Sequence, residues 1–494
     1  MLADSMTASP AGVSAPTVIC KLVVMRAGKT QVLLMEDGAA SRLPTFEIPK
    51  WERPAPHLTR WMKQNWGAQT VCLFQASPEE SVHCSFETPC YVLEVVDSDW
   101  TPRAGMHWYP RVEVGPENLP QAMEYWLLES AVSQALAHDT VGAGSFASSG
   151  FLEPLRTWVE SVLKQQGWTL EREWCQYNLG PFFCLIRFET SGPDVWFKAV
   201  GKPNHREYAI SLKLAELYPG YVPKILGRYP EWNGWLMCHE SGEHPSADWD
   251  LRSWEVVAES LAALQLESTG DCETLLDSTC TDLRLGRLQA LRDDFFAVIA
   301  DLMTLQTVSL PPPLTDLELD FTKSQVNRSL ALLEEIDIPD ALVHLDLNSG
   351  NILLCSRRVV FLDWVQAGVG LPLLNIEYLM ALLKRIRPDK PDWASSILQA
   401  YSQAWETRIS LHRLAHALHF TPIVAAMAFA VGCLDWSKDP RNIPLHTGKL
   451  LRSIARGMHQ EANRLECDEF PPDGKFSSAG RGHLDLESNS QERR

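Results

Sequence analysis

Four polar side chains recur at fixed spacing near residue 350, within the stretch VHLDLNSGNILLCSRRVVFLDW. His344 and Asp346 come first in this stretch. Asn351 lies five residues after the aspartate, and Asp363 follows twelve residues after Asn351. Carboxylate and amide oxygens are hard ligands of the kind that Mg²⁺ prefers. The chemistry open to this set is therefore cation binding, with a further carboxylate that can accept a proton.

The residues between Asn351 and Asp363 predict a β-hairpin. Two apolar runs, at 352–354 and 359–362, are typical of short buried strands, and a polar turn at 356–358 joins them. The hairpin would bring Asn351, at the start of the first strand, close to Asp363, at the end of the second. We therefore expect Asn351 and Asp363 to hold a Mg²⁺ ion.

Asp346 lies on the loop before Asn351, so it can face the same site without binding the metal. It would accept a hydrogen bond from a substrate hydroxyl and orient that hydroxyl towards a phosphoryl group, as in kinase-type phosphoryl transfer. The alternative is a set of ordinary loop residues, because Asp and Asn favour turns. Four spaced polar residues that punctuate two buried strands favour the site, since a motif counts only in its structural context.

The sequence HLDLNSGNILL followed by FLDW resembles the aminoglycoside phosphotransferase family, a branch of the protein-kinase-like fold. The family pattern HGDLHPGN…IDW differs here at Leu345 and at Asn348-Ser349, but the four polar positions are kept. The resemblance covers residues 150–465 and implies two lobes with ATP and Mg²⁺ in the cleft. It also implies that His344 braces the catalytic loop. Asn375 stands where the family often has an Asp shortly after the metal-binding loop, which weakens arguments about how that loop is anchored but not the metal site.

A single lysine stands inside an apolar strand predicted at 195–200, in the sequence WFKAV. A buried lysine needs a partner or a ligand charge. In the kinase interpretation Lys198 grips the α- and β-phosphates of ATP, and Glu207, nine residues further on in the helix REYAISLKLAEL, holds it in place. The alternative is a lysine that extends from an edge strand into water.

Two further parts of the nucleotide site leave a weaker mark on the sequence. The hairpin expected to cover the phosphates, with strands at 175–180 and 181–188, contains one glycine, Gly180. A glycine-rich loop would cradle phosphates better. After a strand predicted at 235–237, the resemblance implies a hinge whose backbone meets the adenine, with Met237 and His239 as the candidate contacts.

Residues 17–138 precede this fold and predict a small α/β domain, with a candidate strand at 109–114 near its end. The order of strand, strand, LPTFE, a helix ending in glycine and a further strand is similar to a Nudix domain. The corresponding helix, HLTRWMKQNWG, contains no Glu or Asp, so the carboxylates that hold Mg²⁺ in that family are missing. We therefore expect a Nudix-like domain without hydrolase activity, and an unrelated α+β domain is the alternative.

The expected architecture is α+β: a protein-kinase-like two-lobed fold, with a β-rich N-lobe and a helical C-lobe, after the Nudix-like domain. A stretch rich in Gly and Ser marks the linker between them. The predicted parts are a disordered N-terminus at 1–16, the Nudix-like domain at 17–138, a linker at 139–150, the N-lobe and hinge at 151–242, the C-lobe at 243–466 and a disordered tail at 467–494.

Composition limits the partners. The 494-residue chain has a formal net charge of −18, which argues against nucleic acid and is compatible with a cationic substrate. Its twelve cysteines match no zinc spacing and no secretory signal is visible, so we expect free thiols in a cytoplasmic protein. The longest apolar run, Ile423 to Leu434, is too short to span a bilayer, so we expect a buried helix and no membrane partner.

These features predict an ATP- and Mg²⁺-dependent phosphotransferase that moves the γ-phosphate to a hydroxyl of a small molecule. The resemblance leaves the acceptor open among aminoglycosides, choline and other small alcohols, and the acidic composition mildly favours a cation. The alternative is a non-catalytic nucleotide-binding sensor or regulatory pseudokinase, which the glycine-poor loop favours. The complete set of catalytic polar residues counts against this alternative.

Overall fold

The computed structural model describes residues 16–467 except residues 28, 39, 51, 77–87, 120, 137–143 and 357. The predicted disordered ends therefore lie outside the described residues, apart from one residue at each border. The chain forms two compact units. Unit 1 comprises the chain up to Tyr208 together with Ile225–His239, and unit 2 comprises Ala209–Lys224 and the chain from Glu240 onwards.

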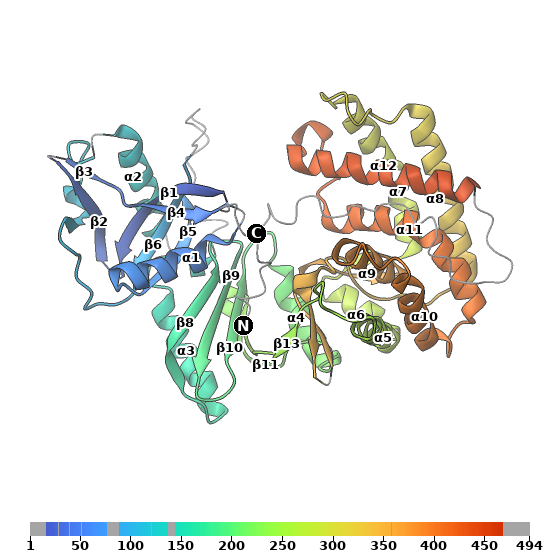
Figure 1. Ribbon diagram of the computed structural model, residues 1–494, viewed down its shortest axis with the longest axis horizontal. Helices are drawn as coiled ribbons and strands as arrows, with labels where there is room; N and C mark the ends of the chain where they lie inside the picture. The colour runs from blue at the N-terminus through green and yellow to red at the C-terminus, as the bar shows by residue number, and fades with distance from the viewer. Residues whose placement is uncertain are drawn as a thin grey trace. The chain divides into compact units, whose positions relative to one another are not determined.

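Unit 1 begins with a seven-stranded mixed sheet, the first sheet (Figure 1). Its main path is β3-β2-β1-β6-β5, with β4 beside β1 and β7 beside β2, and β1 runs parallel to β6. The strands are β1 (Thr17–Arg26), β2 (Lys29–Asp37), β3 (Ala40–Arg42), β4 (Thr45–Pro49), β5 (Thr70–Ala76), β6 (Cys90–Val95) and β7 (Met106–Pro110). The helices are α1 (Pro54–Trp61), which continues as a π-helical turn at Met62–Trp66, and α2 (Ala122–Leu136).

One strand of this sheet is shifted from its predicted position at 109–114. β7 ends at Pro110, opposite Gln31 of β2, and Arg111–Glu113 forms a 3₁₀ turn. Proline has no backbone N–H to donate to the strand ladder, so Pro110 is a natural end for the strand. The prediction for this element was therefore wrong by several residues.

The second sheet of unit 1 has five antiparallel strands in the order β11-β12-β10-β9-β8. Helix α3 precedes it in the chain and β10 is its central strand. The elements are α3 (Leu152–Gln165), β8 (Leu170–Asn178), β9 (Phe183–Thr190), β10 (Val195–Val200), β11 (Ile225–Tyr229) and β12 (Gly234–Cys238).

A single apolar core joins the two sheets of unit 1. It contains side chains from β1, β5 and β6 of the first sheet, from β9 and β10 of the second, and from α2 and α3. The described part of the predicted linker, 144–150, adds Phe146 and Ala147 to this core. Buried Glu94 of β6 accepts hydrogen bonds from Ser149 and from the backbone N–H of Gly150. The N-terminal region and the N-lobe therefore share one core.

Unit 2 is mainly helical, with two three-stranded sheets, β13-β16-β17 and β14-β18-β15. Helix α4 (Arg206–Leu217) begins in unit 1 and continues into unit 2. The other helices are α5 (Leu251–Ser268), α6 (Cys272–Asp277), α7 (Leu285–Thr304), α8 (Asp316–Ile336), α9 (Leu373–Ile386), α10 (Trp393–Trp405), α11 (Leu411–Cys433) and α12 (Leu445–Cys467). The strands are β13 (Gly242–Glu243), β14 (Thr281–Leu283), β15 (Ala341–His344), β16 (Ile352–Cys355), β17 (Val359–Phe361) and β18 (Ala367–Gly370).

Helix α11 contains the apolar run that the sequence marks as a buried helix. Among the described helices it alone is long and apolar enough to cross a membrane, but 83% of its most apolar window is buried inside the protein. It packs against α8, α9 and α12. This burial is typical of a core helix. The predicted α+β class, with a β-rich N-terminal part and a helical C-terminal part, is confirmed.

Candidate active site

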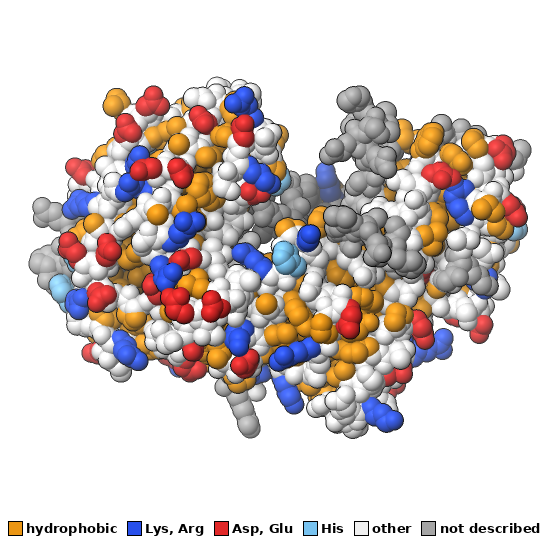
Figure 2. All heavy atoms as spheres, turned by 180° about the vertical axis from the view of Figure 1, so that it is seen from behind, with side chains coloured by type: hydrophobic (Ala, Val, Ile, Leu, Met, Phe, Trp, Pro, Cys, Tyr) orange, Lys and Arg blue, Asp and Glu red, His pale blue; other side chains and the backbone are white. Residues whose placement is uncertain are grey.

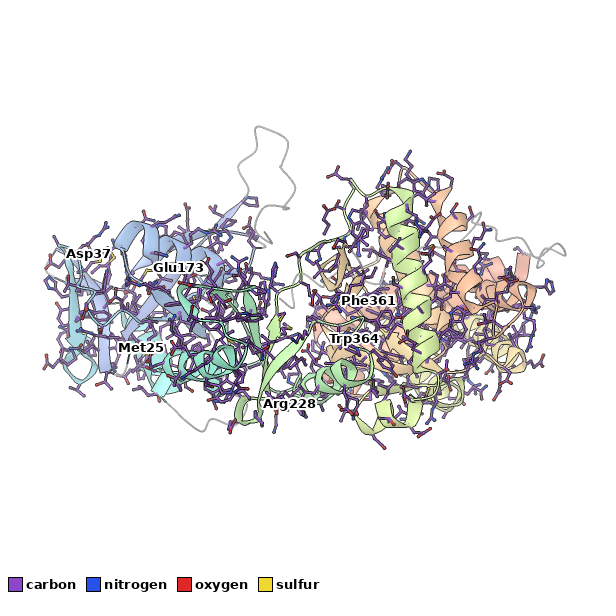
Figure 3. All side chains as sticks on the ribbon, turned by 90° about the horizontal axis from the view of Figure 1, so that it is seen from below. Met25, Asp37, Glu173, Arg228, Phe361 and Trp364 are labelled. Atoms are coloured by element: carbon purple, nitrogen blue, oxygen red, sulfur yellow. The ribbon has the colours of Figure 1, made fainter. Side chains whose placement is uncertain are left out.

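The predicted catalytic stretch folds in unit 2 as a strand, a loop and a hairpin. β15 ends at His344, and β16 pairs with β17 so that Ile352 lies opposite Phe361. The backbone N–H of Leu362 then donates to the carbonyl of Asn351 at 2.9 Å. The predicted hairpin is confirmed, and this bond places Asn351 beside the residue that precedes Asp363. Figure 3 labels Phe361 and Trp364, which lie on either side of this position in the chain.

Two asparagine side chains hold the carboxylate of Asp346. The amide nitrogen of Asn348 donates to Oδ1 at 2.8 Å, and that of Asn351 donates to Oδ2 at 3.1 Å. Asn348 is itself fixed, because its oxygen accepts the backbone N–H of Gly350 at 2.8 Å. Since the nitrogen of Asn351 serves Asp346, its amide oxygen is the atom that can bind a cation. The sequence marks Asn348 only as a departure from the family pattern, so its role was missed.

His344 links the loop to the residue before Asp363. Its Nε2 lies 2.8 Å from the carbonyl oxygen of Leu362, so this nitrogen carries the proton and donates. The ring packs against Trp364, with 4.5 Å between ring centroids, and the residue is buried. This geometry supports the predicted bracing role of His344.

The loop is anchored from behind by Asn375 of α9. Its Oδ1 accepts the backbone N–H of His344 at 2.9 Å, and its Nδ2 donates to the carbonyl of His344 at 2.6 Å. Gln265 donates to the same Oδ1 at 3.2 Å and accepts the hydroxyl of Tyr401 at 2.7 Å. An ionised Asp could accept but not donate, so Asn satisfies both backbone groups. Asn375 therefore anchors the catalytic loop through both backbone groups of His344.

His244 supports the other end of the loop, and no sequence pattern marked it. Its Nδ1 lies 3.0 Å from the carbonyl oxygen of Ser349 and 2.9 Å from that of Ile352. Burial lowers the pKa of His244, although the two carbonyls act in the opposite direction. The neutral ring with a proton on Nδ1 fits this position, because it donates to the loop without a buried charge.

Asp363 has a backbone conformation that non-glycine residues seldom adopt. Its φ of 59° and ψ of 71° lie in the left-handed region, and it precedes the 3₁₀ turn Trp364–Gln366. Residues held in such conformations cluster at ligand sites, where the surrounding structure imposes them. Here the pairing of β16 with β17 on one side and the turn on the other impose it.

In unit 1, Lys198 and Glu207 form the predicted ion pair. Lys198 Nζ lies 2.5 Å from Oε1 of Glu207, and the two residues are only 8% and 2% exposed. The ammonium group also lies 5.9 Å from the ring centroid of Trp235, within range of a cation–π contact. Because β10 is the central strand of its sheet, the alternative of an edge-strand lysine that reaches into water is wrong.

Gly180 lies in the loop between β8 and β9 with a φ of 100°, which glycine adopts without strain. Its backbone N–H donates to the carbonyl of Leu73 in the first sheet at 2.8 Å. A phosphate would have to compete with this carbonyl for the amide. The loop that contains Gly180 is therefore hydrogen-bonded to the first sheet.

The two candidate hinge residues lie at the end of β12, where this strand pairs with β10. Met237 is on β12, opposite Trp196 of β10. His239 Nδ1 accepts the indole N–H of Trp196 at 3.0 Å, and its backbone N–H donates to the carbonyl of Asp194 at 2.9 Å. Adenine contacts by Met237 and His239 stay a prediction.

The donor set suits Mg²⁺ bound together with a nucleotide. No group of three His, Cys, Asp or Glu side chains that could hold a metal occurs in the part of the chain that the structure describes. Asn351 and Asp363 offer an amide oxygen and a carboxylate at one end of the hairpin. Mg²⁺ commonly takes one or two protein ligands and completes its shell with phosphate oxygens and water. These residues therefore fit an ion that arrives with ATP.

Comparisons with known proteins support this site. Residues 202–410 match the model of the phosphotransferase enzyme family. No curated protein matches the chain. Similar solved structures include an ethanolamine kinase from Plasmodium vivax (14% identity, TM-score 0.40, covering 57% of this chain and 81% of that chain). A macrolide 2′-phosphotransferase from Brachybacterium faecium is 17% identical, with a TM-score of 0.40, and the match covers 64% of this chain and 99% of that chain. A choline kinase from Cryptosporidium parvum is 11% identical, with a TM-score of 0.43, and the match covers 64% of this chain and 95% of that chain. Identities and TM-scores at this level say nothing about the acceptor of this chain.

The matched residues include Glu207, the catalytic loop and the hairpin. This part of the chain is therefore similar to the phosphotransferase enzyme family, as the sequence motif predicted. The match indicates an enzyme of the phosphotransferase class.

Proposed function

We propose that the protein transfers the γ-phosphate of ATP, with Mg²⁺, to a hydroxyl of a small molecule in the cytoplasm. The observation that carries the proposal is the carboxylate of Asp346, which Asn348 and Asn351 hold in one orientation. A carboxylate fixed in this way can accept a hydrogen bond from an alcohol and align it for attack. Free thiols at the described cysteines suit a reducing compartment.

Each side chain has one task in the proposed reaction. Lys198, held by Glu207, binds the α- and β-phosphates. Asn351 and Asp363 would hold Mg²⁺, which when bound would shield the charge of the phosphates. Asp346 orients the acceptor hydroxyl and receives its proton late, because positioning dominates when the transition state is loose.

The acceptor is best approached through its chemistry, because the fold does not identify it. On the face shown in Figure 2, Lys and Arg side chains are interspersed with Asp and Glu side chains over the described surface. The net negative charge is therefore not gathered into one patch on that face. A panel of amino alcohols, aminoglycosides and neutral sugars tests cationic and neutral acceptors together.

The central experiment compares Asp346→Asn with Asp337→Asn. Asp337 is an exposed residue nine positions earlier, in a left-handed conformation that Asn tolerates, so the control makes the same chemical change outside the site. With an acceptor from the panel, we expect Asp346→Asn to lower kcat about 10²- to 10⁴-fold, in the range of general-base removal. Asp337→Asn should retain wild-type kcat. Near-normal turnover by Asp346→Asn would refute the assignment.

A nucleotide-binding sensor without transfer is the second candidate. The hydrogen bond from Gly180 to Leu73 favours it, because that amide is already used within the protein. The sensor predicts tight binding of MgATP, measured by calorimetry, with no phosphorylated product from any acceptor in the panel. Transfer that EDTA abolishes and added Mg²⁺ restores would exclude the sensor.

A further inference from the structure

The loop between β8 and β9, residues 179–182, and Asn178 at the end of β8 are held by the N-terminal part of unit 1. The backbone N–H of Gly180 donates to the carbonyl of Leu73, as described above. Arg53, which precedes α1, donates to Oδ1 of Asn178 at 2.9 Å. Leu179 packs against the apolar cluster of the first sheet that includes Leu58, Met62 and Trp66. The loop expected to cover the phosphates is thus docked on the N-terminal region.

A bulge in β5 and a buried glutamine of β8 make this docking specific. The pairing of β5 with β6 shifts between Cys72 and Phe74, so Leu73 is an extra residue whose carbonyl points out of the ladder and can accept from Gly180. The side chain of Gln176 in β8 forms two hydrogen bonds of 2.7 Å, to the backbone N–H and the carbonyl of Cys72. Gln176 is only 1% exposed. Its amide completes the edge of the first sheet as a neighbouring strand would.

The other side of the loop is held by the end of β10. The backbone N–H of Gly201 donates to the carbonyl of Phe182 at 2.8 Å. A Cβ at position 201 would lie 1.9 Å from the carbonyl oxygen of Pro181, so only glycine permits this approach. Gly201 follows Lys198 by three residues. The loop is therefore fixed between the first sheet and the strand that carries Lys198.

We propose that the N-terminal sheet positions the β8–β9 loop for the nucleotide, with Arg53 and Gln176 as positioning residues. The inference rests on the proposed function, because it concerns the same ATP. The sequence of a loop with a single glycine does not by itself favour a phosphate-binding conformation. Hydrogen bonds from the neighbouring sheet order this loop before the nucleotide binds. Ordering a loop before binding reduces the loss of conformational freedom on binding. The N-terminal region then acts as a scaffold. This role does not require the metal-binding glutamates that are missing from its Nudix-like helix.

The test compares Arg53→Ala with Lys63→Ala in the full chain. Lys63 forms an ion pair with Glu173 of β8, which Figure 3 labels. This ion pair joins the same two parts of unit 1, five residues before Asn178, and both side chains are about half exposed. Arg53→Ala should weaken MgATP binding, measured by calorimetry, about threefold to tenfold, the range for one lost hydrogen bond. Lys63→Ala should leave it unchanged, since surface ion pairs contribute little.

Hydrogen–deuterium exchange of the peptide covering 176–182, without nucleotide, provides a readout that does not depend on ATP. It should be faster in Arg53→Ala than in wild type and unchanged in Lys63→Ala. A second variant, Asn178→Asp, keeps a side-chain oxygen that can accept from Arg53. Its exchange rate and its MgATP affinity should therefore match those of wild type. With an acceptor in hand, Arg53→Ala should raise the KM for ATP while kcat changes less than about twofold, as expected when the ground state and the transition state lose the same binding energy.

Three results would overturn the inference. Exchange in Arg53→Ala could stay at the wild-type rate, which would show that the loop does not depend on this contact. Faster exchange with unchanged MgATP binding would show that the loop is not coupled to the nucleotide. Equal losses of MgATP binding in Arg53→Ala and Lys63→Ala would indicate a general loosening of unit 1. Failure of wild type to bind MgATP would instead overturn the proposed function, and this inference with it.

Discussion

The ion pair between Lys198 and Glu207 allows a quantitative test of the interior of unit 1. Glu207→Gln keeps the size of the side chain but removes a carboxylate that neutralises the charge of Lys198 in a buried position. Removing one partner of a buried pair costs about 3–5 kcal/mol. Gln can still accept a hydrogen bond and Trp235 still faces the ammonium group, so we expect the lower limit, about 3 kcal/mol.

Urea unfolding followed by tryptophan fluorescence measures this loss. With a slope of about 2–3 kcal/mol/M, the midpoint of the transition should fall by about 1–1.5 M. Glu216→Gln is the control, because Glu216 lies on the same helix but pairs with Lys213 at the surface, where the change should stay within about 0.5 kcal/mol. The double variant Lys198→Met/Glu207→Leu should recover most of the stability, since an apolar pair has no charge to desolvate. An unchanged midpoint in Glu207→Gln, or a double variant less stable than the single one, would refute this reasoning.

Two further predictions concern unit 2. Asn375→Ala leaves the backbone N–H and carbonyl of His344 without these partners in the interior, so the free energy of unfolding should fall by about 2 kcal/mol or more, measured by urea unfolding. Asn375→Asp should be less stable than wild type near neutral pH, because a carboxylate cannot donate to the carbonyl of His344; equal stability would contradict the anchoring role. The lowered pKa of His244 means that the unfolded chain binds a proton more readily than the folded one. Its contribution to stability is therefore present above pH 6.5 and is lost as the pH falls through the lower folded pKa. Wild type should lose more stability between pH 7.5 and 5.5 than His244→Gln, and parallel losses would show that another group is responsible.

The positions of the main elements could be predicted because they depend on local pattern. The hairpin of β16 and β17 follows from two apolar runs and a polar turn. The pairing of Lys198 with Glu207 follows from one charge in an apolar strand and one acid at the start of the next helix. Both predictions use residues close together in the chain.

The supporting contacts could not be predicted, because they join distant parts of the chain through single polar side chains. Asn375 meets His344 across 31 residues, and Gln176 meets Cys72 across 104 residues. A lone Asn or Gln has no periodicity, and its partners here are backbone groups, which every residue possesses. The shift of β7 has a local cause, since Pro110 ends the strand, and closer attention to that proline could have placed it.

By itself, the sequence located the strands and helices that carry the candidate site residues, and it predicted a role for each of these residues in phosphoryl transfer. Side-chain type and apolar spacing act over a few residues, so they can be interpreted without knowledge of the fold. Tertiary structure alone decided that the N-terminal sheet and the N-lobe share one core, and that Asn348, Asn375, His244 and Gln176 hold the loops in place. Those relations depend on which backbone groups the folded chain brings within hydrogen-bonding distance, and no local pattern records them.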